Sequence, residues 1–168
     1  MKKILIAIDY DPSAQQVAET GHKLGKAINA DIILLHVIMD SVYYSSLQYS
    51  PVMGFGGFMS DTMPVLDSVE LVKAANGFLE RTRTHLGDEK VQIITAEGET
   101  TASSILKVAK EMEADMIVMG SHSRSGLDKI LMGSVTEKVL HHSTIPLFLI
   151  PNRKQEEQAG NTKEAGVY

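Results

Sequence analysis

Five short apolar runs alternate along this chain with longer stretches of helical periodicity, and this alternation constrains the fold more than any other feature. The runs are KKILIAID, DIILLHVI, VQIITA, DMIVMGS and TIPLFLIP. Helical periodicity covers residues 12–28, 67–86, 101–112 and 134–142. Strands that are apolar almost throughout are buried on both faces, as in a parallel sheet covered by helices.

The sequence therefore predicts an α/β fold with a doubly wound, five-stranded parallel sheet of order 3-2-1-4-5 and helices on both faces. This architecture is Rossmann-like or flavodoxin-like, and its ligands bind at the carboxyl ends of the strands, where the strand order reverses. That point lies between the first strand, which ends at Asp9, and the fourth, which ends at Gly120. We expect these two residues to meet at one crevice.

Length and composition limit the kind of protein further. The 168 residues are enough for one domain, which we expect at 1–151, followed by a polar and disordered tail at 152–168. The chain has no cysteine, which excludes disulfides and suits a cytoplasmic location. A net charge of −5 without a basic block argues against a nucleic-acid partner. No apolar run in the sequence approaches the roughly 20 residues that a membrane-spanning helix needs.

The connection at residues 39–66 is much longer than is usual between the elements of an α/β unit. It contains Tyr43, Tyr44, Tyr49, Phe55 and Phe58, which are five of the nine aromatic residues. It is either a mobile surface excursion or a flap that packs on a ligand or a second subunit, because exposed aromatic surface often has a partner.

The segment after the fourth strand has the features of an anion site. Gly120 permits a close approach of the backbone, and Gly133 and Ser134 precede a helix whose first amides can bind anions. Arg124 and Lys129 add positive charge, and Ser121, Ser123 and Ser125 add hydroxyl groups. These residues predict a polyphosphate pocket. Alternatively, the glycines only form turns, and Ser134 caps its helix in a capping box with Glu137.

Three stretches together resemble the universal stress protein family: KKILIAIDYDPSA, EADMIVMG and MGSHSRSGLDKILMGSVTEKVLHHSTIPLFLIP. The resemblance covers residues 1–151. Nucleotide-binding members of the family carry Gly, two residues, Gly, nine residues, and then Gly-Ser or Gly-Thr. Here Ser123 replaces the second glycine. If that position needs a positive φ, the serine costs about 1 kcal/mol, although its hydroxyl can donate to a phosphate.

The resemblance implies that the chain binds ATP, or the related AMP or ADP, with Mg²⁺ able to accompany the phosphates. Asp9 would lie at the ribose and adenine end, and the Val37 backbone would contact adenine. The residues that would contact the nucleotide are Ala7, Ile8, Asp9, Val37, Met119, Gly120, His122, Ser123, Arg124, Gly133, Ser134, Val135 and Thr136.

A catalytic interpretation has less support in the sequence. An apolar strand followed by Asp9 and Asp11 also begins haloacid-dehalogenase-like phosphatases, in which the first carboxylate is the nucleophile. No acidic pair closes a later strand to hold magnesium. The chain lacks a Walker loop and a strand-borne dinucleotide motif. Without a convincing base for hydrolysis, we expect binding rather than catalysis.

Family members are commonly homodimers through the last strand, here from Thr144 to Ile150, and some bind no nucleotide. A nucleotide-free homodimer that interacts with an unknown downstream protein is therefore the alternative function. Of the histidines, we expect His36 to be a satisfied core residue and His122 to lie in the phosphate pocket or in solvent. The adjacent His141 and His142 are expected on the surface rather than at a metal.

Overall fold

The sheet has the topology that the sequence predicts. A computed structural model describes residues 2–39, 68–122 and 133–152, and its sheet has the order β3-β2-β1-β4-β5 with every neighbouring pair parallel. The predicted 39–66 flap beyond Met39 and the predicted tail beyond Asn152 lie outside the described residues. The strands are β1 (Lys2–Ala7), β2 (Ala30–Met39), β3 (Gln92–Gly98), β4 (Met116–His122) and β5 (Leu147–Asn152).

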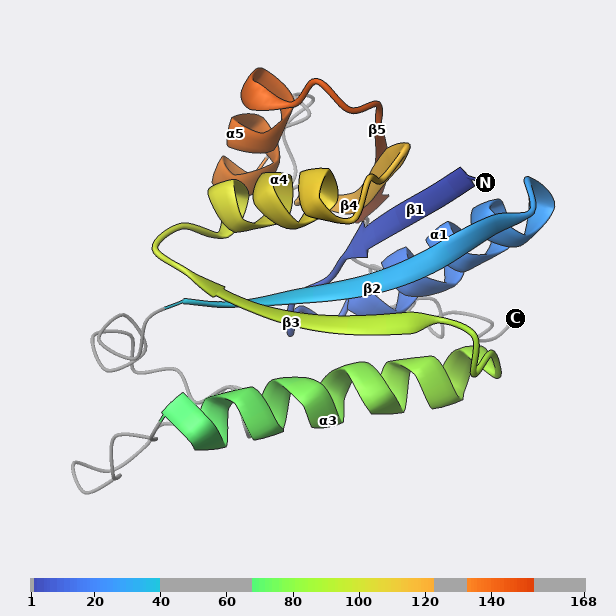
Figure 1. The fold of residues 1–168 in the computed structure, drawn as a ribbon, viewed down its shortest axis with the longest axis horizontal. Helices are drawn as coiled ribbons and strands as arrows, with labels where there is room; N and C mark the ends of the chain where they lie inside the picture. Colours follow the sequence, from blue (N-terminus) through green and yellow to red (C-terminus); the bar gives the residue numbers. More distant parts are fainter. Residues whose placement is uncertain (1, 40–67, 123–132, 153–168) are drawn as a thin grey trace, which may run out of the picture.

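Helices cover both faces of the sheet (Figure 1). The green α3 runs along one face, and the yellow α4 and orange α5 run along the opposite face. The buried side chains show that α1 shares the face of α3. Each helix begins and ends within two residues of its predicted bounds. The helices are α1 (Ala14–Ala27), α3 (Ser68–Leu86), α4 (Thr101–Glu111) and α5 (Ser134–His142).

The central strand β1 shows why its sequence is apolar without interruption. Ile4 and Ile6 pack in the core layer beneath α1 and α3, whereas Leu5 packs in the layer beneath α4 and α5. All three side chains are at most 1% exposed. Successive strand residues point to opposite faces, so a strand that is covered on both faces needs an apolar residue at each position.

Two local predictions were wrong. Strand β5 begins at Leu147 rather than Thr144, and the carbonyl oxygen of Pro146, just before it, accepts a 2.9 Å hydrogen bond from the Ile117 amide. The predicted capping box at the start of α5 does not form, because Ser134 is already the first helical residue and Gly133 is the N-cap. The Glu137 amide donates to the Gly133 carbonyl at 3.0 Å, which places the helix start one residue earlier than a serine cap requires.

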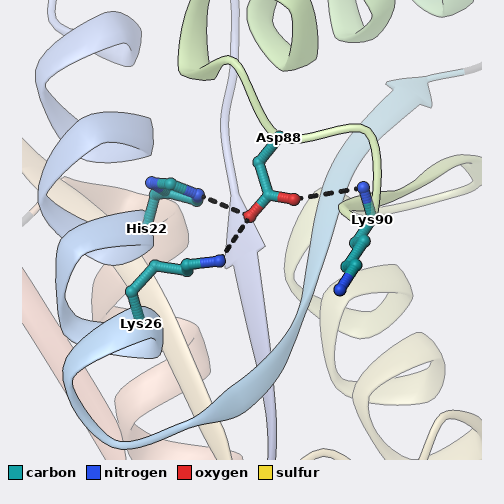
Figure 2. A network of polar contacts seen from close by, with 4 residues as sticks. All are labelled: His22, Lys26, Asp88 and Lys90. Carbon is teal, nitrogen blue, oxygen red and sulfur yellow. Dashed lines mark hydrogen bonds and ion pairs between the residues drawn. The ribbon is translucent and has the colours of Figure 1, made fainter.

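Asp88, in the turn between α3 and β3, connects that turn to α1 (Figure 2). One carboxylate oxygen accepts hydrogen bonds from His22 Nε2 at 3.0 Å and from Lys26 Nζ at 3.2 Å. The other accepts from the Lys90 amide at 3.1 Å. The hydrogen bonds from His22 and then from Lys26 lower the pKa of Asp88 to about 2. Asp88 is therefore an anion at neutral pH and joins α1 to the turn that precedes β3.

Candidate functional site

Strand β1 ends before both of its neighbours, and this leaves a recess in the carboxyl edge of the sheet. The last residue of β1, Ala7, pairs with Leu35 of β2 and with Met119 of β4. Beyond that level β2 continues beside β3 to Met39, and β4 continues beside β5 to His122. We call this backbone feature the β1 recess, with residues 8–9 at its base and residues 36–39 and 120–122 on its two sides. It lies at the predicted switch point, where doubly wound sheets bind ligands.

The N-terminus of α5 is joined to one side of the β1 recess. Thr136, which is 2% exposed, donates a hydrogen bond from Oγ1 to the carbonyl oxygen of Gly120 at 3.0 Å. The first amides of an α-helix have no acceptor within the helix and lie at the positive end of its dipole. In α5 these amides belong to Ser134, Val135 and Thr136. The arrangement brings a cluster of hydrogen-bond donors beside the end of β4, as the sequence predicts for Gly120 and Gly133.

Asp9 and Asp11 form successive turns between β1 and α1. Asp9 Oδ1 accepts from the Asp11 amide at 3.1 Å, and Asp11 Oδ1 accepts from the Ser13 amide at 2.9 Å. Such aspartate turns replace the backbone partners that residues before a helix lack. Asp11 therefore supports the start of α1 from two residues before the N-cap, which is Ser13. Asp9 is exposed at the base of the recess.

His36 lies in β2 beside the same turn, and it is 3% exposed. Its Nδ1 is 2.9 Å from the carbonyl oxygen of Ile8, and its ring contacts those of Tyr10 and Phe78. Burial lowers the pKa of His36, against the opposing effects of the Ile8 hydrogen bond and the Asp9 charge. Among the described residues, Nε2 has no hydrogen-bond partner. The prediction of a core histidine is thus confirmed, but within the described part of the chain only Nδ1 has a hydrogen-bond partner.

The other predicted contact residues divide by how their side chains lie. Those of Val37 and Met119 are 8% and 5% exposed and pack in the core layer beneath α4 and α5. The side chains of these two residues are therefore turned into the core, and only their backbone could contact a ligand. Ala7 and Val135 are half-buried, and Ser134 is exposed. Ser123, Arg124 and the side chain of His122 lie outside what the structure describes.

The remaining candidates behave as surface groups. His141 and His142 are exposed at the end of α5, as predicted. In the described ranges, no three His, Asp or Glu side chains gather where they could hold a metal ion.

None of the helices described is both long and apolar enough to cross a membrane.

A five-stranded parallel sheet of this order, with a recess at the switch point, defines a domain of the flavodoxin-like α/β class. The model of the universal stress protein family matches residues 1–151, and the chain belongs to this family. It is 31% identical over 157 residues to universal stress protein MJ0577 of Methanocaldococcus jannaschii, covering 90% of this chain and 96% of that one. It is 30% identical over 152 residues to universal stress protein YxiE of Bacillus subtilis, covering 88% and 97%.

Solved structures agree with this assignment. The structure of MJ0577 has a TM-score of 0.65 at 29% identity, over 91% of this chain and 97% of that one. Two more distant neighbours were solved with adenine nucleotides. One is a universal stress protein in complex with cAMP, with a TM-score of 0.59 and 15% identity over 89% and 96% of the chains. The other, from Archaeoglobus fulgidus, is in complex with dAMP, with a TM-score of 0.54 and 16% identity over 89% and 97%. At such identities these two show a shared fold alone.

Proposed function

We propose that this protein binds an adenine nucleotide, with ATP as the principal ligand, at the β1 recess, and that it acts as a cytoplasmic homodimeric regulator rather than a catalyst. The observation that carries the proposal is the Thr136 to Gly120 hydrogen bond, which holds the amides of the first turn of α5 beside the end of β4. Phosphates bind at such helix starts because unpaired amides and the helix dipole both favour negative charge.

The phosphate end and the adenosine end of the ligand would contact different groups of the protein. The phosphates would lie against residues 133–136 and Ser123, and Mg²⁺ can accompany them. The adenosine end would lie at the base of the recess, near Asp9 and the Val37 backbone. The cAMP and dAMP complexes of two proteins with the same fold support an adenine nucleotide over other anions.

Binding is favoured over a phosphatase reaction by the way Asp9 and Asp11 are engaged. Both carboxylates accept amide hydrogen bonds within the turn before α1. In a phosphatase of this kind Asp11 would be the general acid, but here its carboxylate accepts a hydrogen bond from the Ser13 amide and supports the start of α1. A generic aryl phosphate ester offered to the protein should therefore release no phosphate.

The proposal is tested by titration calorimetry with ATP, ATP·Mg²⁺, AMP and GTP, together with thermal melting. A ligand that binds only the folded state stabilises it by mass action and so raises Tm. At a free ligand concentration of 100 times Kd, the gain in the free energy of unfolding is about 2.7 kcal/mol. Gly133→Val is the diagnostic variant. Gly133 has φ −61° and ψ 152°, which a valine tolerates, so this change adds a side chain beside the phosphate positions without straining the backbone. Binding of ATP by the wild type and its loss in Gly133→Val support the proposal; no heat and no Tm shift with any nucleotide would reject it.

The edge strand β5 is the candidate dimer interface both in the proposed function and in its alternative, a nucleotide-free homodimer. Strand β5 is the last strand of the sheet, and Phe148 on it is 38% exposed. An apolar edge invites pairing with a second copy. Sedimentation equilibrium of the wild type and of Phe148→Lys tests this interface. A dimer that Phe148→Lys weakens, in a protein that binds none of the nucleotides, would favour the interaction function.

A further inference from the structure

His36 contacts the chain on both sides of Asp9. Its Nδ1 lies 2.9 Å from the carbonyl oxygen of Ile8, the residue before Asp9. Its ring centroid lies 4.5 Å from that of Tyr10, the residue after Asp9, in an edge-on arrangement. Phe78 of α3 closes the group, 4.9 Å from Tyr10 and 5.6 Å from His36. One buried side chain thus touches both neighbours of the exposed carboxylate at the base of the β1 recess.

The hydrogen bond determines which nitrogen carries the proton. A carbonyl oxygen only accepts, so Nδ1 must be the donor. Burial disfavours the charged ring, and the neutral imidazole then has a lone pair on Nε2 to which no described residue donates. Burying a nitrogen that has no partner among the described residues costs free energy. A phenylalanine in the same apolar surroundings would avoid that cost. The chemistry specific to histidine at this position is therefore the bond from Nδ1 to Ile8.

That bond acts where the chain leaves the sheet. The Ile8 amide donates to Leu35 at 2.9 Å, so both polar groups of Ile8 are held by β2: the amide by its backbone and the carbonyl by the side chain of His36. The peptide plane between Ile8 and Asp9 contains that carbonyl, so its orientation determines the direction in which Asp9 projects. Tyr10, packed on the same ring, restricts the chain on the other side.

We propose that His36 is a positioning residue for the nucleotide site: by holding Ile8 and Tyr10 it sets the direction in which Asp9 is presented at the β1 recess. The inference rests on the proposed binding of an adenine nucleotide there. His36 itself is buried and need not touch the ligand.

Three variants separate positioning from packing. His36→Phe keeps an aromatic ring but removes the donor. His36→Asn places an amide nitrogen at the position of Nδ1 and so retains a donor toward Ile8. Phe78→Leu disturbs the same aromatic group but leaves the Ile8 bond in place. For each variant, circular dichroism confirms folding, titration calorimetry measures the Kd for ATP, and hydrogen exchange measures the protection of the Asp9 to Ser13 amides.

We expect His36→Phe to weaken ATP binding about tenfold, the effect of one lost hydrogen bond to a positioned group, and to speed exchange at the Asp11 and Ser13 amides. His36→Asn should recover most of the affinity and protection, and Phe78→Leu should lower Tm without either change. Wild-type affinity in His36→Phe, or equal losses in Phe78→Leu, would overturn the inference.

Hydrogen exchange also separates this inference from the proposed function. If the wild type binds no nucleotide, the proposed function fails and the nucleotide role of His36 fails with it. Faster exchange in His36→Phe alone would then still establish that His36 holds the turn. If the wild type binds ATP and His36→Phe binds it equally well, only the positioning role fails.

Discussion

The hydroxyl group of Thr136 donates a 3.0 Å hydrogen bond to the carbonyl oxygen of Gly120, sixteen positions earlier in the chain. It connects the first turn of α5 to the end of β4, on one side of the β1 recess. Gly120 near the end of β4 and Gly133 at the N-cap of α5 are thereby brought to the same side of the sheet edge, and the proposed phosphate position lies beside the first amides of α5.

Replacing Thr136 with valine should weaken this connection. Thr136→Val keeps the buried shape and removes the donor, so the free energy of unfolding should fall by about 1 kcal/mol. Thr136→Ser keeps the donor and removes one buried methyl group, at a similar cost of about 0.8 kcal/mol. Urea unfolding should therefore show similar losses. Calorimetry should show weaker ATP binding, by up to about tenfold, in the valine variant alone; equal affinities would show that the bond only stabilises the fold.

Two glycines of α1 let this helix approach the sheet closely. A Cβ atom at Gly25 would lie 2.7 Å from Ile32 Cγ1, and one at Gly21 would lie 3.1 Å from Val118 Cγ1 and 2.8 Å from Ile6 Cδ1. Gly25→Ala and Gly21→Ala should each destabilise the protein by about 1–3 kcal/mol through overpacking.

Gly77 of α3 is the matched control for these substitutions. The nearest atom to a Cβ there is a guanidinium nitrogen of Arg81 at 3.4 Å, which can move. Gly77→Ala should therefore stabilise the helix by about 1 kcal/mol. Urea unfolding of the three variants measures whether each change raises or lowers the free energy of unfolding. A gain in stability in Gly25→Ala would contradict the close approach of α1 to the sheet.

Glu113, just after α4, has a φ of 53°, the left-handed region that costs a residue with a side chain about 1–2 kcal/mol. Glu113→Gly should raise the free energy of unfolding by about 1 kcal/mol. The change loses only a 3.9 Å ion pair with Lys3, in which Glu113 is 87% exposed and which contributes little. Glu113→Ala removes the same charge without relieving the backbone, so thermal unfolding should show no comparable gain for it.

The network around Asp88 should make stability depend on acid pH. Its pKa falls from 3.8 to about 2 on folding, so the native state favours the anion. This contribution is fully present above about pH 4 and is lost as the pH falls through about 2. Asp88→Asn should cost about 1 kcal/mol at pH 5, allowing for the partial exposure of Lys26, and less at pH 3.

Urea unfolding at the two pH values measures this difference. Glu89→Gln, a change at an exposed neighbouring residue, should alter stability by less than about 0.5 kcal/mol at either pH. If the difference in the free energy of unfolding between wild type and Asp88→Asn is the same at pH 3 as at pH 5, the carboxylate is not held by His22 and Lys26.

Sequence reasoning failed where the outcome depended on one local contact. Ser134 and Glu137 have the spacing of a capping box, and this pattern predicts a serine cap for α5. In the fold Thr136 bonds to Gly120 and the helix begins one residue earlier. The apolar run predicts that β5 starts at Thr144, but the strand begins at Leu147, and the Pro146 carbonyl before it accepts from the Ile117 amide. Neither contact leaves a pattern in the neighbouring sequence.

The sequence by itself determined the parallel sheet, its strand order, the helix positions and the pairing of the first strand with the fourth. These follow from periodic burial and from the short, right-handed connections of α/β units, which many residues specify together. Only the tertiary structure decided that His36, Tyr10 and Phe78 form one group around the base of the β1 recess. These residues come from a strand, a turn and a helix that are far apart in the chain, and such contacts depend on the packing of whole elements rather than on the residues beside them.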